Sequence, residues 1–177
     1  MNLRLMFQDE AGFGRINKPR ACWCCEGVRP VVPCQLVREY TYAYGAICPI
    51  DGEMVSLVLP KCNTECMNIF LEEISKSYPN DYILLGCDNA SWHKSKGLKV
   101  PDNIEIFSLL SYTPELNPIE MIWDELREKF FKNELFKTLN KVSDKLCEGL
   151  NYLMCNNSVV KSIAGWGWIL SMFLKAK

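Results

Sequence analysis

The strongest constraint on the fold is the uninterrupted apolar run YILLGCD at residues 82–88. Strands covered on both faces read as continuous apolar runs, whereas half-exposed strands alternate apolar and polar residues. The run therefore predicts a central strand of a sheet that is covered on both faces. It ends in Asp88, and a shorter apolar run at residues 3–10, LRLMFQDE, ends in Asp9 and Glu10.

The rest of the chain alternates between strand and helix patterns. Further strands are expected at residues 41–48 and 53–59, joined by an Asp-Gly turn, and at residues 104–109. Helices are expected from Asn63 to just before Pro79, over residues 117–130, and from about Thr138 onward. Residues 12–33, rich in Gly, Pro and Arg, are expected to form a loop with a possible hairpin. This order favours an α/β fold, a mixed sheet with helices packed on its faces.

Length and composition predict one globular domain over residues 1–177. The chain is 49% apolar, and its 20 basic and 21 acidic residues give a formal charge of -1. No overall positive field attracts it to nucleic acid, so DNA contacts must come from local patches or from a partner. Its apolar runs are far shorter than the roughly 20 residues that span a bilayer, and the amino terminus lacks a signal-peptide pattern. We therefore expect no membrane association and a cytosolic location.

The ten cysteines do not indicate a disulfide scaffold, because that inference belongs to short exported chains. We expect most of them to be reduced, buried thiols. Their spacing does not match paired CxxC knuckles, which argues against a structural zinc site.

Three acidic residues form the candidate active site. Asp9 and Asp88 each end an apolar strand, and the carboxyl ends of strands are where ligand sites form in open α/β sheets. Glu120 would arrive from the first turn of a helix that follows the next strand. Crowded carboxylates repel unless a cation is present, and hard oxygen ligands suit Mg²⁺ or Mn²⁺. Two such ions would activate a water or hydroxyl on one side of a phosphate and stabilise the leaving oxygen on the other.

A purely structural interpretation is available for each acid. Asn117 at the N-cap and Glu120 at the third helical position match a capping box, and local chemistry alone favours that interpretation. Asp9 and Asp88 would then be polar strand ends.

Three neighbouring residues leave further alternatives open. Glu10 and Asp124 are alternative metal ligands, because Glu10 adjoins Asp9 and Asp124 lies one turn beyond Glu120. His93 is a candidate contact to DNA or a structural hydrogen-bond donor.

Three segments resemble, in order and spacing, the acidic motifs of DDE transposases of the mariner superfamily, in its bacterial insertion-sequence branch. They are FQDEAGFG (residues 7–14), CDNASWHKS (87–95) and SYTPELNPIEMIWDELR (111–127). The resemblance implies a ribonuclease H-like fold with a five-stranded sheet in the order 3-2-1-4-5. It also implies that Asp9, Asp88 and Glu120 are the catalytic, metal-binding triad for two Mg²⁺ or Mn²⁺ ions.

The implied reaction is hydrolytic nicking at transposon ends, followed by attack of the freed 3′-hydroxyl on target DNA, commonly at a TA step. A homodimer is expected for pairing two ends. Family members usually carry an amino-terminal helix-turn-helix region, so we expect a separate DNA-binding chain or a truncated product here. The alternatives are a non-catalytic remnant that binds or regulates the full-length enzyme and a nuclease that cleaves RNA hybrids.

Several residues near the acidic motifs are candidate DNA contacts. They are Arg15, Lys18 and Arg20 after the first motif, and Trp92, His93, Lys94 and Lys96 in the second. Basic loop residues are also commonly no more than solvated charges. Trp92 has the aromatic face needed to stack on an unpaired base, although burial under the sheet edge is the more common role for such a residue.

Overall fold

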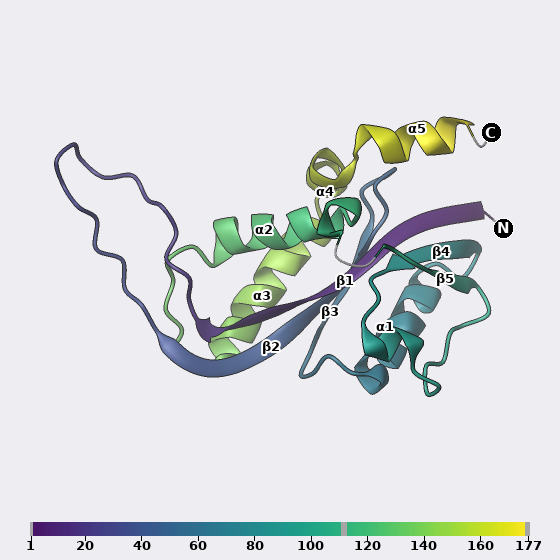
Figure 1. Cartoon of the computed structure of the whole chain (residues 1–177), viewed down its shortest axis with the longest axis horizontal. Helices are drawn as coiled ribbons and strands as arrows, with labels where there is room; N and C mark the ends of the chain where they lie inside the picture. The colour runs from purple at the N-terminus through teal and green to yellow at the C-terminus, as the bar shows by residue number, and fades with distance from the viewer. Residues whose placement is uncertain (1, 111–112, 176–177) are drawn as a thin grey trace.

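The computed structural model describes residues 2–110 and 113–175, and it contains a five-stranded mixed sheet (Figure 1). The strands are β1 (Asn2–Ile16), β2 (Leu36–Ile47), β3 (Met54–Leu59), β4 (Asp81–Cys87) and β5 (Ile104–Ser108). Their spatial order is β3-β2-β1-β4-β5, which confirms the predicted order. β1 pairs antiparallel with β2 and parallel with β4, so β1 lies at the centre of the sheet.

Helices cover both faces of the sheet, as predicted. The helices are α1 (Thr64–Ser77), α2 (Ile119–Phe130), α3 (Leu139–Met154), α4 (Asn157–Ala164) and α5 (Gly167–Lys175). α1 packs on one face, while α2 and α3 pack on the other with α4 behind them (Figure 1). The two short helices α4 and α5 were not expected from the sequence.

Alternation along β1 divides the core into two clusters. Phe7, Ala11 and Phe13 point to the face covered by α2 and α3, whereas Met6 points to the face covered by α1. Successive side chains of a strand point to opposite faces, so β1 contributes side chains to both clusters. A strand in that position has to be apolar on both sides, which is the pattern that the sequence shows for β1 and β4.

Local signals predicted two helix starts and one turn correctly. The side chain of Asn63 accepts a hydrogen bond from the backbone N–H of Cys66 at the start of α1. Thr138 does the same for Lys141 at the start of α3. Gly52 has a φ of 80° in the β2–β3 turn, a conformation that glycine adopts without steric cost.

The expected loop over residues 12–33 was wrong in part. β1 continues to Ile16 and β2 begins at Leu36, so the two strands form a long twisted arm, and only residues 17–35 are loop (Figure 1). Two of the three glycines in that segment, Gly12 and Gly14, lie inside β1, and only Gly27 lies in the loop. A Cβ atom on Gly14 would lie 2.4 Å from the carbonyl oxygen of Glu39, so the partner strand approaches too closely for a side chain.

The cysteine expectation was half right. All ten cysteines are free thiols, but only Cys48, Cys66 and Cys87 are buried, and four of the exposed ones lie in or beside the arm loop. Within the described residues, no helix combines the length and apolarity needed to cross a bilayer.

The packing of α2 over β2 generates a stability prediction at Gly45. A Cβ atom there would lie 2.6 Å from the ring of Trp123 and 2.9 Å from the side chain of Ile119, both fully buried. Gly45→Ala should therefore lower the free energy of unfolding by about 1–3 kcal/mol, the usual cost of overpacking. Urea unfolding followed by circular dichroism measures this change.

The matched control is Gly167→Ala, because a Cβ atom on Gly167 meets no atom within 4 Å. Its stability should equal or slightly exceed that of the wild type, since alanine has the higher helix propensity. Equal stability of both variants and the wild type would contradict the tight packing of α2 on β2.

Candidate active site

The register between β1 and β4 brings two of the predicted acids together at one edge of the sheet. These parallel strands pair Phe7 with Gly86, and Asp9 and Asp88 each stand two residues further along. Neighbouring strands lie about 4.8 Å apart. The two aspartates therefore occupy corresponding positions just past the last paired residues of β1 and β4. Asp88 follows the end of β4 as expected, but Asp9 does not end its strand, because β1 continues to Ile16 along β2.

Asp9 is a buried carboxylate on the face covered by α2. Its side chain accepts a 2.9 Å hydrogen bond from the indole N–H of Trp123, which is itself fully buried. Burial, reinforced by the charge of Glu120, raises the pKa of Asp9 to about 7, and the Trp123 bond only partly opposes this. Near neutral pH the metal-free site therefore holds a carboxyl group with a high proton affinity.

Glu120 lies in the first turn of α2, on the same side of the sheet as Asp9. Burial raises its pKa, and the charges of Asp124 and Asp88 add to that rise while Arg127 opposes it. The charge of Glu120 contributes to the raised pKa of Asp9, and the charge of Asp88 contributes to the raised pKa of Glu120, so Glu120 interacts electrostatically with each aspartate.

The predicted capping box at Glu120 was wrong. The residue at the N-cap of α2 is Pro118, which has no side-chain cap, and the buried amide of Asn117 donates to the carbonyl oxygen of Gln8 at 3.1 Å. A cap requires a side chain that turns toward the helix amides. Asn117 instead ties the start of α2 to β1, next to Asp9. Ser111 and Tyr112 of the third motif lie outside the described residues.

Asp88 is held by His93 in a bridge that reaches the other face of the sheet. His93 Nδ1 lies 2.9 Å from Asp88 Oδ1, and Nε2 lies 3.1 Å from Glu10 Oε1. The same Oδ1 accepts from the backbone N–H of Ala90. Burial alone would lower the pKa of His93, but its bonds to Asp88 and Glu10 outweigh that effect and raise it to about 10. The imidazolium in turn lowers the pKa of Asp88.

Glu10 is buried on the α1 side of the sheet, where its carboxylate pairs with His93. Its side chain is 3% exposed, and Oε1 also accepts hydrogen bonds from Gln8 and Trp92. Asp124, the other alternative ligand, is 63% exposed and pairs with Arg20 and Arg127. Both side chains are thus occupied by partners within the chain.

The donor set fits hard divalent cations, because the side chains at this edge offer carboxylate oxygens. His93 and the backbone N–H of Ala90 contact Oδ1 of Asp88, and the bond from Trp123 uses Oδ2 of Asp9. As they stand in residues 2–110 and 113–175, no three His, Cys, Asp or Glu side chains are grouped closely enough to hold an ion. The metal-binding roles of Asp9, Asp88 and Glu120 therefore stay a prediction.

Some of the candidate DNA contacts pair with other residues of the chain, and others are exposed. Arg15 donates to the carbonyl oxygen of Phe136 and pairs with Glu39, and Arg20 pairs with Glu128. Lys18 is exposed at the start of the loop that joins β1 to β2. The remaining candidates lie beyond β4: Lys94 and Lys96 are exposed, His93 is buried, and Trp92 is half-buried with its indole N–H bound to Glu10.

Two residues that shape the site were missed by sequence reasoning. Trp123 was expected only on the buried side of a helix, and no sequence signal shows that its N–H meets Asp9. Arg127 was not considered, although its spacing of seven residues from Glu120 places both on one helical face. Its guanidinium lies 5.2 Å from the ring centre of Phe13, further along β1.

A mixed five-stranded sheet in this order with helices on both faces defines an α/β domain, and sequence comparison specifies the family. The family described as DDE superfamily endonuclease matches residues 4–143, and the chain belongs to it. An uncharacterized protein of Sinorhizobium fredii, y4pE/y4sA, is 37% identical over 130 residues, which cover 73% of this chain and 96% of that protein.

Solved structures share the fold. The Mos1 transposase paired-end complex with the left transposon end superimposes with a TM-score of 0.60 at 16% identity over 92% of this chain. The Mos1 mariner paired-end complex with Mn gives a TM-score of 0.60 at 15% identity, also over 92%. The chain spans about 55% of the length of these transposase chains. The predicted ribonuclease H-like fold is thereby confirmed, and the family match confirms the predicted membership of the DDE endonucleases.

The raised pKa of Asp9 generates a prediction for the metal-free protein. The pKa is about 7 in the folded state and 3.8 ordinarily, so the folded state binds this proton more tightly. As the pH rises from about 4 to 7, the free energy of unfolding falls, by at most about 4 kcal/mol. Asp9→Asn removes this titration and keeps an acceptor for Trp123. The variant should match the wild type near pH 4 and exceed it in stability above pH 7.

Urea unfolding in EDTA across this pH range measures the difference between Asp9→Asn and the wild type. A difference that stays constant with pH would mean that Asp9 does not titrate in this range.

The buried bridge generates a second prediction. Glu10→Ala removes one partner of an enclosed ion pair and leaves His93 charged, which should lower the free energy of unfolding by about 3 kcal/mol. The control is Glu72→Ala, which breaks an exposed pair with Lys76 and should cost less than about 1 kcal/mol. Equal losses in the two variants, measured by urea unfolding at neutral pH, would contradict a charged bridge at Glu10.

Proposed function

We propose that residues 1–177 form the catalytic unit of a transposase that cleaves DNA at transposon ends and joins the 3′-hydroxyl to target DNA. The observation that carries this proposal is the parallel register of β1 and β4, which sets Asp9 and Asp88 at corresponding positions, with Glu120 in the first turn of the helix that covers the same face as Asp9. Membership of the DDE endonuclease family and the fold of Mos1 transposase support it.

Asp9, Asp88 and Glu120 would hold two Mg²⁺ or Mn²⁺ ions. Such ions supply a polarised water or hydroxyl and neutralise charge on the phosphate when bound. Structures of the Mos1 complex with Mn and with Mg support this choice of metal. Their charge would also release the proton that burial favours on Asp9.

Surrounding side chains orient the acids for this role. Trp123 fixes one oxygen of Asp9, and His93 with the N–H of Ala90 fixes Oδ1 of Asp88. Partners of this kind hold ligands at metal sites in a single orientation, and their loss typically weakens metal binding by 10–100-fold. The second oxygen of each aspartate is therefore the one assigned to the metal.

The partners proposed for this chain are the transposon ends and target DNA, with TA as the target step. A helix-turn-helix segment, on a separate chain or elsewhere in a longer protein, would recognise the ends, and two copies would pair them. We place the reaction in the bacterial cytosol or nucleoid, in line with the bacterial relative.

Asp88→Asn tests the function. Purified wild-type chain, supplied with an end-binding segment and transposon-end duplexes, should nick DNA in Mn²⁺, and the variant should fall to background. Asp102→Asn, an exposed acid away from the sheet edge, is the control and should retain wild-type nicking. A folded wild-type chain that never nicks would refute the proposal.

A metal titration separates an active enzyme from a non-catalytic remnant. A ligand specific for the folded state stabilises it by RT ln(1 + [L]/Kd), about 2.7 kcal/mol at a hundredfold excess over Kd. Mn²⁺ should raise the melting temperature of the wild type and of Asp102→Asn, and much less that of Asp88→Asn. A remnant with a dead site would show no rise in any of them. Cleavage of RNA–DNA hybrid in preference to duplex DNA would instead favour a hybrid-specific nuclease.

A further inference from the structure

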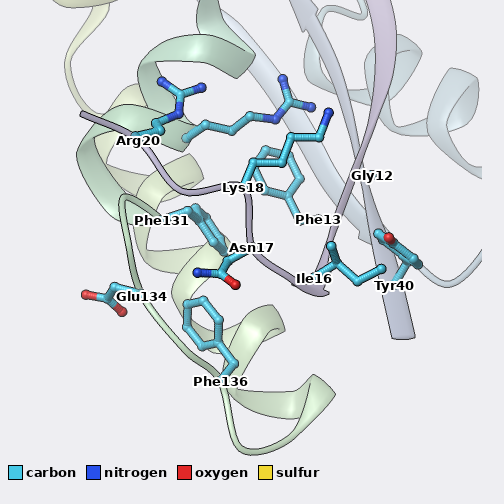
Figure 2. Close-up of a pocket in the computed structure, with 12 residues that line it drawn as sticks. Gly12, Phe13, Ile16, Asn17, Lys18, Arg20, Tyr40, Phe131, Glu134 and Phe136 are labelled. Atoms are coloured by element: carbon cyan, nitrogen blue, oxygen red, sulfur yellow. The ribbon is translucent and has the colours of Figure 1, made fainter. Parts of the chain in front are cut away.

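A pocket of about 330 Å³ lies where the ends of β1 and β2 next to their connecting loop meet the turn between α2 and α3 (Figure 2). Cationic side chains of Lys18, Arg20 and Arg127 line it, together with the rings of Phe131 and Phe136. In Figure 2 the charged ends of Lys18 and Arg20 lie on one side of the pocket and the ring of Phe136 on the opposite side. The pocket thus has a cationic side and an aromatic side, and Glu134 adds one carboxylate to its lining near Phe136 (Figure 2).

Hydrogen bonds hold the walls of this pocket in place. The side chain of Asn17 donates to the carbonyl oxygen of Pro33 and accepts from the N–H of Gln35, which closes the neck of the arm loop. Asn133 binds both backbone groups of Arg20 in the same two-sided way. A pocket fixed at both walls is largely formed before any ligand arrives, which limits the entropy lost on binding.

The charge of this region differs from that of the chain. Residues 12–40 carry five basic and two acidic side chains, a formal +3, whereas the whole chain carries -1. Arg20 and Arg127 pair with Asp124 and Glu128 in partly exposed contacts, which are worth little energy and readily exchanged for a phosphate. Lys18 has no salt bridge to any residue in the described part of the chain.

The pocket lies on the same side of the sheet as Asp9 and Glu120. Phe13 is four residues beyond Asp9 on the same face of β1, and Arg127 is seven residues beyond Glu120 on α2. These separations correspond to about 13 Å along a strand and about 10 Å along a helix. A DNA strand advances about 3.4 Å per nucleotide, so the pocket lies roughly three or four nucleotides from the acidic edge.

We propose that this pocket holds one unpaired nucleotide of the DNA strand whose phosphate is at the acidic edge. The base stacks on Phe136, and its phosphate lies between Lys18 and Arg127. A volume of 330 Å³ lies at the small end of the range for ligand pockets, about 300–1,000 Å³, which suits one nucleotide better than a base pair. The inference rests on the proposed function, since it assumes DNA at the acidic edge.

Binding of single strands in EDTA tests the pocket without any cleavage. The probes are fluorescein-labelled hexathymidylate and its abasic counterpart, which keeps the phosphates and lacks the bases, and anisotropy at low salt gives each Kd. Lys18→Gln should weaken both probes by about the same factor, because it removes a phosphate contact. Phe136→Leu should weaken hexathymidylate roughly tenfold and the abasic strand hardly at all, because stacking is worth about 1–3 kcal/mol per base.

Lys76→Gln is the matched control, because it removes the same charge from an exposed position on α1, on the opposite face of the sheet. Its Kd values should equal those of the wild type. Melting temperatures of all variants establish that they fold. If a variant fails to fold, Phe136→Tyr, which keeps the ring, and Lys18→Arg, which keeps the charge, should retain wild-type affinity for both probes.

Two results would overturn the proposal. One is wild-type protein that does not bind hexathymidylate, and the other is folded Lys18→Gln and Phe136→Leu variants that bind both probes within twofold of the wild type. The proposed nuclease function is judged separately by nicking in Mn²⁺. A chain that nicks normally and shows no pocket effect refutes only the pocket, whereas the predicted affinity pattern without nicking refutes only the nuclease.

Discussion

The contact on which the candidate site most depends is the packing of Trp123 against the centre of the sheet. Its ring lies over Gly45 of β2, its edge meets Phe13 of β1, and its N–H binds Asp9. One side chain therefore sets the distance of α2 from the sheet and the orientation of a buried carboxylate together. Because Glu120 and Arg127 are carried by the same helix, both the acidic edge and the arm pocket take their positions from this contact.

The adjacent buried acids Asp9 and Glu10 lie in opposite electrostatic surroundings. Glu10 on the α1 side is enclosed with three donors, one of them the protonated His93, so its charge is compensated within the fold. Asp9 on the α2 side has neutral donors and an acidic neighbour, so burial there raises its proton affinity. Uncompensated burial of a charge destabilises the fold unless the group is protonated or meets a cation. The difference between these adjacent residues is the reason for assigning metal to Asp9 and a supporting role to Glu10.

The sequence predicted the sheet and the candidate acids because their signals are local or follow from register. The apolar runs at β1 and β4 define central strands, and both end in aspartates that a parallel register aligns. The role of Asn117 was not predictable. The local sequence is the same whether its side chain caps the helix or binds the distant Gln8. The length of β1 and β2 was also missed. Glycines in a sequence suggest a loop unless it is known that a neighbouring strand, here β2, approaches too closely for a side chain.

The arm resolves the apparent conflict between a chain of net charge -1 and a DNA substrate. Positive charge is concentrated in residues 12–40, and the remainder of the chain is acidic, including the edge where the phosphate would react. In the proposed function, an acidic edge would repel DNA until cations occupy it, whereas the positive charge of residues 12–40 would attract DNA without metal. If DNA and metal act together here, the arm holds the strand while cations enter between the carboxylates and the phosphate. DNA binding and metal binding would then be separable, with the first dependent on salt and the second on the acids of the sheet edge.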